Sequence, residues 1–131
     1  MSISFRVIER GEPGVAGGGT TKKYYAQTLT SGEKNIDDLT HRIEQISTVS
    51  GADIRAVLYG LMDVIPEMLA NGQIVVLGDV GRLRVSLSSK GEIGPSDVNA
   101  SSIRGAKILF RPGNKLQDML KTLSFKKESS S

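Results

Sequence analysis

The stretch KILFRPGNKLQDML, residues 107–120, joins a predicted strand to a predicted helix at a single point. Apolar residues precede Arg111-Pro112-Gly113, and leucine or methionine then recurs at helical spacing. Pro112 has no N–H to donate and biases Arg111 toward an extended conformation, so it ends the strand. Gly113 permits a sharp change of direction, and we expect Asn114 to cap the following helix. The stretch therefore predicts a strand tied directly to a short helix whose leucines pack on the body of the protein.

Length and composition are those of a soluble globular chain. The 131 residues are 38% hydrophobic and 24% charged, which suits one domain. The absence of Cys excludes disulfides, thiolate metal sites and a cysteine nucleophile. The chain has no signal-like start and no run of about 18 apolar residues. We therefore expect a cytoplasmic protein with no membrane partner.

Residues 1–34 are predicted to form strands. SISFRVIER alternates apolar and polar residues, KKYYAQTL is typical of a second strand, and residues 11–21 form a glycine-rich connection between them. A phosphate-binding loop requires Gly-Lys-Ser/Thr leading into a helix, whereas Thr20-Thr21-Lys22-Lys23 leads into a strand. We therefore expect a hairpin, or two paired edges, with a flexible connection and no nucleotide site.

Two amphipathic helices are predicted between residues 35 and 71. Asn35 and Asp38 have the spacing of a capping box, and Ser50 with Asp53 repeats it at the start of the second helix. The second helix carries an unusually wide apolar stripe, formed by Ile54, Val57, Leu58, Leu61, Ile65, Met68 and Leu69, with Met62 and Val64 beside it. A stripe this wide must be buried against more than one neighbour. Because the rest of the core is thin, a second copy of the chain is one way to cover it.

A sheet with a long arm is predicted after the helices. Residues 73–77, 82–88 and 106–110 have strand patterns, and Leu83, Val85 and Leu87 should face the core while Arg82 and Arg84 face outward. Residues of about 88–104 are polar and turn-rich, so they have little to bury. We expect them to form an extended arm, and we expect residues 124–131 to form a flexible tail.

The charge of the chain is uneven. Residues 1–80 carry 7 Lys/Arg against 10 Asp/Glu, whereas residues 81–131 carry 10 Lys/Arg against 4 Asp/Glu. A basic half of this size attracts a polyanion, although a solvated surface is the alternative. The cations on the outward strand face and beside the arm are suited to nucleic-acid phosphates. They are Arg82, Arg84, Lys90, Arg104, Lys107, Arg111 and Lys115.

No group of residues predicts catalysis. His41 lies one turn after Asp37 but off the apolar stripe, so a solvated helical ion pair explains it better than a general base. A second His, a Cys and a tight carboxylate cluster are all missing, which leaves no metal site in the sequence. We therefore expect no enzyme, no cofactor and no small-molecule substrate.

The order of these elements resembles the bacterial histone-like HU and integration-host-factor family. MLANGQIVVLGDVGRLRV, residues 68–85, is similar to the family's Leu-x-x-Gly followed by Gly-Phe-Gly-x-Phe. FRPGNKLQDML, residues 110–120, is similar to its Phe-Lys-Pro-Gly-Lys-x-Leu, with Arg111 in the place of the lysine. The resemblance covers about residues 35–121. Residues 1–34 have no counterpart in the short family members and resemble the N-terminal addition of a longer, divergent branch.

The resemblance implies an α+β fold with two N-terminal helices, a three-stranded antiparallel sheet with an extended arm, and a short C-terminal helix in an intertwined dimer. It implies duplex DNA as the partner, with arms in the minor groove and Pro95 as the wedge between base steps. The implied dimer contacts are Val57, Leu58, Leu61, Ile65, Leu69 and Phe110.

The predicted organisation is an N-terminal strand extension over residues 1–34, an HU-like DNA-binding domain over 35–123 and a tail over 124–131. The predicted function is that of a homodimeric nucleoid-associated protein that binds duplex DNA with low sequence specificity, condensing or bending it. The alternative is a protein-interaction or scaffolding module that keeps the fold and no longer binds DNA strongly. Binding to random duplex DNA at several salt concentrations separates the two.

Overall fold

The computed structural model describes residues 2–11 and 22–128, and it divides the chain into two compact units. One unit comprises residues 35–119. The other joins the N-terminal extension to the C-terminal end, residues 1–34 and 120–131. The expectation of one domain with a free tail is therefore wrong, because the end of the chain belongs to the same unit as its beginning. The glycine-rich connection lies almost entirely outside the described residues.

Two helices open the 35–119 unit: α1 (Ile36–Ile46) and α2 (Gly51–Ala70). The predicted capping box is confirmed, because the Asp38 N–H donates to the Asn35 side chain at 3.0 Å and the Asn35 N–H donates to the Asp38 carboxylate at 2.9 Å. The Ser50 hydroxyl likewise accepts from the Asp53 N–H at 3.3 Å. Both helices therefore begin where the sequence places their caps.

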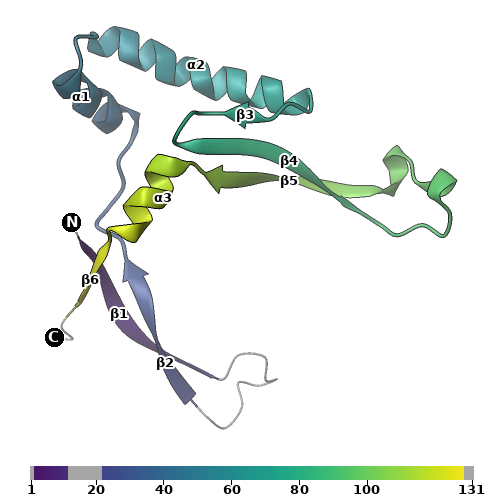
Figure 1. Cartoon of the computed structure of the whole chain (residues 1–131), viewed down its shortest axis with the longest axis horizontal. Helices are drawn as coiled ribbons and strands as arrows, with labels where there is room; N and C mark the ends of the chain where they lie inside the picture. The colour runs from purple at the N-terminus through teal and green to yellow at the C-terminus, as the bar shows by residue number, and fades with distance from the viewer. Residues whose placement is uncertain (1, 12–21, 129–131) are drawn as a thin grey trace. The chain divides into compact units, whose positions relative to one another are not determined.

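A three-stranded antiparallel sheet follows, in the order β3–β4–β5, from β3 (Val75–Val76), β4 (Gly81–Ser89) and β5 (Ile103–Pro112). Figure 1 shows α2 lying along β3 and the base of β4, while β4 and β5 continue beyond it as a two-stranded arm. The arm ends in two short 3₁₀ turns, η2 (Pro95–Asp97) and η3 (Ala100–Ser102). The predicted order of two helices, three strands and a short helix is confirmed.

The junction after β5 is tied to the turn between β3 and β4. The Gly113 N–H donates to the Val80 carbonyl at 2.9 Å, and the Lys115 N–H donates to the Asp79 carbonyl at 3.2 Å. The helix α3 (Asn114–Lys121) starts immediately afterwards. The expected cap at Asn114 is wrong, because the Gly113 carbonyl already accepts the first helical bond, from the Gln117 N–H at 2.9 Å.

Little of this unit is buried within a single chain. Ile54, Leu69 and Val75 are the only apolar side chains among the described residues that are largely hidden from solvent. Leu83, Val85 and Leu87 share one sheet face with Phe110 and Ile108, as alternation predicts. Leu83 is half-buried, but Val85 and Leu87 are exposed, so the expectation that this face is a closed core is wrong for one chain.

The other unit is a three-stranded sheet in the order β2–β1–β6. The strands β1 (Ser2–Gly11) and β2 (Lys22–Leu29) pair antiparallel, which confirms the predicted hairpin. The strand β6 (Ser124–Lys127) pairs parallel with the start of β1, and the Glu128 N–H donates to the Phe5 carbonyl at 2.8 Å. Residues 124–127 are therefore not the flexible tail that their polar composition predicts, because β1 offers them an open edge.

Candidate nucleic-acid interface

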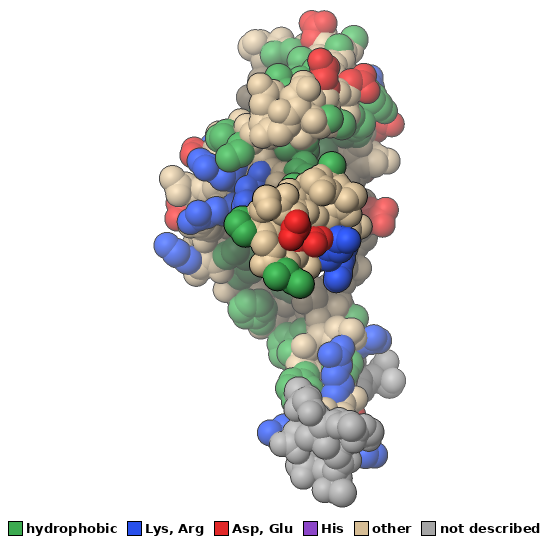
Figure 2. Space-filling model, turned by 90° about the vertical axis from the view of Figure 1, so that its right-hand side faces the viewer, with side chains coloured by type: hydrophobic (Ala, Val, Ile, Leu, Met, Phe, Trp, Pro, Cys, Tyr) green, Lys and Arg blue, Asp and Glu red, His purple; other side chains and the backbone are tan. Residues whose placement is uncertain are grey.

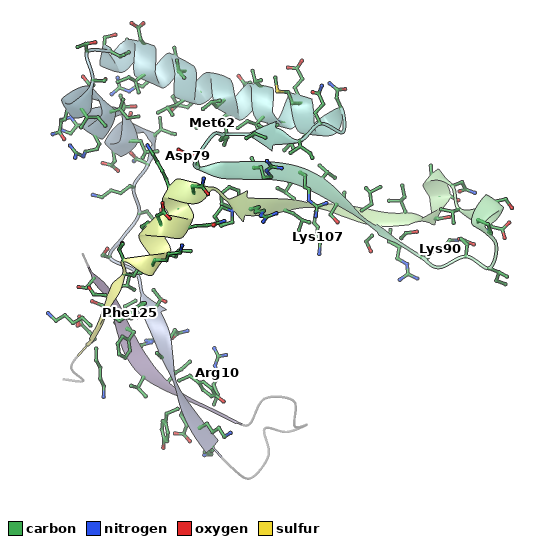
Figure 3. All side chains as sticks on the ribbon, in the orientation of Figure 1. Arg10, Met62, Asp79, Lys90, Lys107 and Phe125 are labelled. Carbon is green, nitrogen blue, oxygen red and sulfur yellow. The ribbon has the colours of Figure 1, made fainter. Side chains whose placement is uncertain are left out.

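One face of the β4–β5 ribbon is basic. In the antiparallel register Arg82 lies opposite Arg111, Arg84 opposite Leu109, and Ser86 opposite Lys107. Side chains of opposed residues point to the same side of a sheet, so the four cations share one face. Leu109 lies among these cations, whereas Leu83, Val85, Leu87, Ile108 and Phe110 occupy the other face. Lys107 lies on the arm (Figure 3), and Figure 2, which looks toward the arm tip, shows Lys and Arg side chains gathered to one side of it.

The four cations have no acidic partners within the described part of the chain. The salt bridges there join Lys22 to Glu9, Arg55 to Asp37, and Lys90 to Glu92. Like charges directly opposite one another destabilise a sheet, and Arg82 and Arg111 are opposed in this way. An anion bound between them would relieve that repulsion. The face is therefore electrostatically suited to a polyanion.

Shallow hollows follow the basic face from α3 toward the arm. Arg82 and Arg111 line the first, together with Asp79 of the β3–β4 turn and Asn114 and Gln117 of α3. The Gln117 side-chain amide donates to the Pro112 carbonyl at 2.9 Å, which holds it against the end of β5. Arg82, Arg84 and Arg111 line the second hollow. Amide groups that donate and accept hydrogen bonds thus stand beside the arginines, a combination suited to phosphate oxygens.

A β-bulge brings Arg104 to the same region. The pairing register shifts between Ser88 and Ser89, so Ser88 pairs with Gly105 and Ser89 with Ile103, which leaves Arg104 without an opposite residue. Bulges re-aim side chains relative to a regular strand. Arg104 accordingly lines a hollow with Ser88 and Lys107.

The arm tip is closed by its own polar groups. The Ser102 hydroxyl, 1% exposed, donates to Glu92 at 3.2 Å, and the same carboxylate oxygen lies 3.5 Å from the Lys90 ammonium. The Asp97 carboxylate accepts from the Gly94 N–H at 3.2 Å. Both acidic side chains of the tip are therefore engaged by neighbouring donors. Ile93 is exposed over its whole side chain, at 106% of the reference area.

The predicted DNA contacts thus fall into two groups. Arg82, Arg84, Lys107 and Arg111 share a face, and the bulge brings Arg104 beside them. Lys90 lies near the tip in an ion pair (Figure 3), Pro95 opens η2, and Lys115 lies on α3 without lining any of the hollows described above. Sequence reasoning missed Ile93, Asn114 and Gln117, since only the folded arm and junction show where they point.

The predicted dimer contacts also divide by exposure. Val57, Leu61 and Phe110 are exposed in a single chain, Val57 by 63%. Leu58 and Ile65 are half-buried. Leu69 is only 6% exposed, which makes it a core residue of one chain with little surface to offer a partner.

No catalytic or metal-binding arrangement appears among the described residues. Asp37 bonds the Arg55 guanidinium at 3.1 Å, and His41 lies 3.4 Å from the Gln45 amide, so the expected His41–Asp37 pair is not formed. Within residues 2–11 and 22–128 no three His, Cys, Asp or Glu side chains gather into a possible metal site. The helices of that part of the chain are too short or too polar to cross a membrane.

Comparison with known proteins adds three findings. A family model described as "HU domain fused to wHTH, Ig, or Glycine-rich motif" matches residues 1–127. A crystal structure from Bacteroides vulgatus ATCC 8482, provisionally described as a bacterial DNA-binding protein, superposes with a TM-score of 0.65 at 12% identity. The match covers 96% of this chain and 48% of that one, so the chain spans about half the length of the neighbour. Among curated proteins no sequence matches.

Proposed function

The chain belongs to the family of HU domains fused to a wHTH, Ig or glycine-rich motif, and on that premise we propose that it binds duplex DNA through the basic face of its β4–β5 ribbon. The observation that carries the proposal is the single face shared by Arg82, Arg84, Lys107 and Arg111, none of which has an acidic partner within the described residues. We propose an architectural role in the nucleoid and no enzymatic activity.

The chemistry of this face favours phosphates over base edges. Guanidinium groups match phosphate oxygens with paired N–H donors, and such contacts position a protein on DNA without reading its sequence. Asn114 and Gln117 line a hollow beside the arginines, and a hydrogen bond to the Pro112 carbonyl fixes the Gln117 side chain at the end of β5. We therefore propose low sequence specificity and a binding free energy dominated by counterion release.

The arm is proposed to enter the minor groove. Two features favour this mode. The acidic groups of the tip are engaged by Ser102, Lys90 and the Gly94 N–H, and apolar side chains of the tip are exposed to solvent. Pro95 is exposed, but it forms the first residue of a turn. Ile93 is fully exposed and apolar, and we propose it as the wedge between base steps.

A homodimer is proposed because one chain leaves its apolar side chains uncovered. Val57, Met62 and Met68 on α2 are exposed, as are Ile108 and Phe110 on the sheet. Apolar patches of more than a few hundred Å² are rare on monomeric proteins and mark interfaces. A second copy that places the same faces against these would supply the missing core.

A scaffolding role is the second candidate. It is favoured by the apolar face of the β2–β1–β6 sheet, where Val7, Tyr24 and Phe125 are exposed. A protein partner covering that face would make the chain an adaptor, and DNA binding by the β4–β5 ribbon would be weak.

One titration tests the proposal. Binding of the wild type to random-sequence duplex DNA is measured at 50–200 mM salt. Arg82→Ala/Arg84→Ala is measured beside it, with the control Arg42→Ala, whose only side-chain hydrogen bond within the described residues is to Gln45. Each phosphate contact adds about 0.9 to the slope of log K against log salt. The double variant should lose about 1.8 from the slope, so that over this range the wild type loses about 12-fold more affinity than the variant.

Arg42→Ala should leave the slope unchanged, because it lies on α1. If micromolar wild-type protein does not shift duplex DNA even at low salt, the DNA proposal is wrong and the scaffolding role is the remaining candidate. An unchanged slope in the double variant places the phosphate contacts elsewhere.

A further inference from the structure

We propose that the β2–β1–β6 sheet carries a second duplex-DNA-binding surface, on the face that presents Arg6, Arg10, Lys23 and Lys126. The partner rests on the proposed function, since duplex DNA would be the ligand of both surfaces. The site itself stands on separate residues in a separate unit. Neither the family description nor the structural neighbour assigns a ligand to these residues.

The register of the sheet places the four cations together. Arg10 lies opposite Lys23, Arg6 lies opposite Gln27, and Lys126 of β6 pairs with Ser4. Since opposed residues share a face, all four belong to one side of the sheet. The other side holds Ile3, Phe5 and Val7 of β1, with Tyr24 and Phe125 from the flanking strands. Arg10 projects outward from the hairpin in Figure 3.

Of the acidic residues beside these strands, Glu9 lies off this face. It belongs to the apolar side, where its carboxylate lies 3.3 Å from the Lys22 ammonium. Glu128 follows β6, its N–H donates to the Phe5 carbonyl at 2.8 Å, and it lines a hollow with Ser4 and Leu29 at the end of the face remote from Arg10. Within the described residues, Arg10, Lys23 and Lys126 therefore form no ion pair.

Two features indicate a bound anion. Arg10 and Lys23 are like charges directly opposite one another, an arrangement that costs stability unless a counter-charge lies between them. The Arg6 guanidinium is held by two hydrogen bonds to the Gln27 side-chain oxygen, at 2.9 and 2.8 Å from Nε and Nη2. The group is thereby fixed in direction, and three of its five N–H donors remain for a ligand.

The spacing and the side chains of the face favour duplex DNA. Arg6 and Arg10 are four residues apart on one strand, a span of about 13 Å, which equals about four base-pair rises along the axis of a duplex. Tyr25 is the only aromatic side chain on this face of the described strands, and it is half-buried, so the face lacks the stacking platform that single strands require.

The test compares neighbouring lysines that lie on opposite faces. Lys23→Gln and Lys22→Gln remove the same charge one residue apart, and only Lys23 belongs to the proposed surface. In the full chain, Lys23→Gln should lower the slope of log K against log salt by about 0.9, and Arg10→Gln/Lys23→Gln should lower it by about 1.8. Lys22→Gln should leave the slope unchanged. Arg10→Lys keeps the charge and should also keep the slope.

The arginine variants of the ribbon separate this inference from the proposed function. If Arg82→Ala/Arg84→Ala leaves the slope unchanged while Arg10→Gln/Lys23→Gln lowers it, the ribbon proposal fails and the second surface stands. The opposite pattern, in variants with wild-type circular dichroism, overturns the second surface. If Lys22→Gln lowers the slope as much as Lys23→Gln, the second surface is also overturned. Equal losses from the two faces would show that the slope responds to net charge and not to a particular site.

Discussion

Gly113→Ala tests whether the strand-to-helix junction is closed by direct backbone packing. A Cβ built on Gly113 would come closest to the Asp79 carbonyl oxygen and would lie 2.6 Å from the Asp79 carbonyl carbon and 3.0 Å from its Cα. These are backbone atoms of the β3–β4 turn, and they cannot move aside like the end of a flexible side chain. The substitution must therefore separate the junction from the turn.

The expected cost follows from what the separation disrupts. Inserting one carbon into a filled contact costs about 1–3 kcal/mol. The bonds from Gly113 N–H to Val80 and from Lys115 N–H to Asp79 span the same contact, and each contributes about 0.5–1.5 kcal/mol. With one of them lost, the free energy of unfolding should fall by about 2–4 kcal/mol. For a chain of this length that lowers Tm by roughly 10 °C.

Thermal unfolding followed by circular dichroism, at matched protein concentrations, measures the effect. Gly91→Ala is the control, because a Cβ there meets nothing within 4 Å, and its Tm should stay close to that of the wild type. A Gly113→Ala protein that melts with the wild type would refute the close backbone packing and the role of this glycine in the fold.

Three further results are expected. Light scattering should give twice the chain mass of 14.0 kDa. Val57→Asp/Leu61→Asp should shift the protein toward the monomer, since the dimer would bury two charges at the α2 surface. Removal of residues 124–131 should speed amide hydrogen exchange in residues 2–5 of β1, because β6 covers that edge; unchanged exchange would contradict the pairing. Ile93→Ser should reduce DNA bending, measured by fluorescence energy transfer between duplex ends, and leave the salt slope unchanged.

The helices and the sheet order were predictable because their signals are local. Asn35 and Asp38 are three residues apart, and a capping box needs nothing else. Pro112 ends β5 in any context, since it lacks the donor that a further ladder bond would require. Strand alternation likewise assigned Arg82 and Arg84 to the face opposite Leu83.

The parts that were missed depend on distant partners. Residues 124–127 form a strand only because β1 offers an open edge more than a hundred residues earlier in the chain. The polar arm tip concealed a network in which Ser102, Glu92 and Lys90 satisfy one another. The basic surface around Arg10 was not predicted, because the net charge of residues 1–80 is negative. In a sheet, however, charge is distributed by alternation between faces, and the balance of a segment does not describe either face.

In both sheets most of the cations lie on the face opposite most of the apolar side chains, and this arrangement separates two kinds of contact. Ile108 and Leu83 lie on the opposite side of the ribbon from Arg82 and Lys107, and Phe5 lies on the opposite side of its sheet from Arg6. Covering an apolar face with a partner is favourable, because it removes apolar surface from water. A basic face must instead stay accessible to phosphates. We therefore propose that assembly and DNA binding use opposite sides of the same strands. It follows that Ile108→Asp should change the mass measured by light scattering, whereas Lys107→Gln, its sequence neighbour, should change only the salt slope.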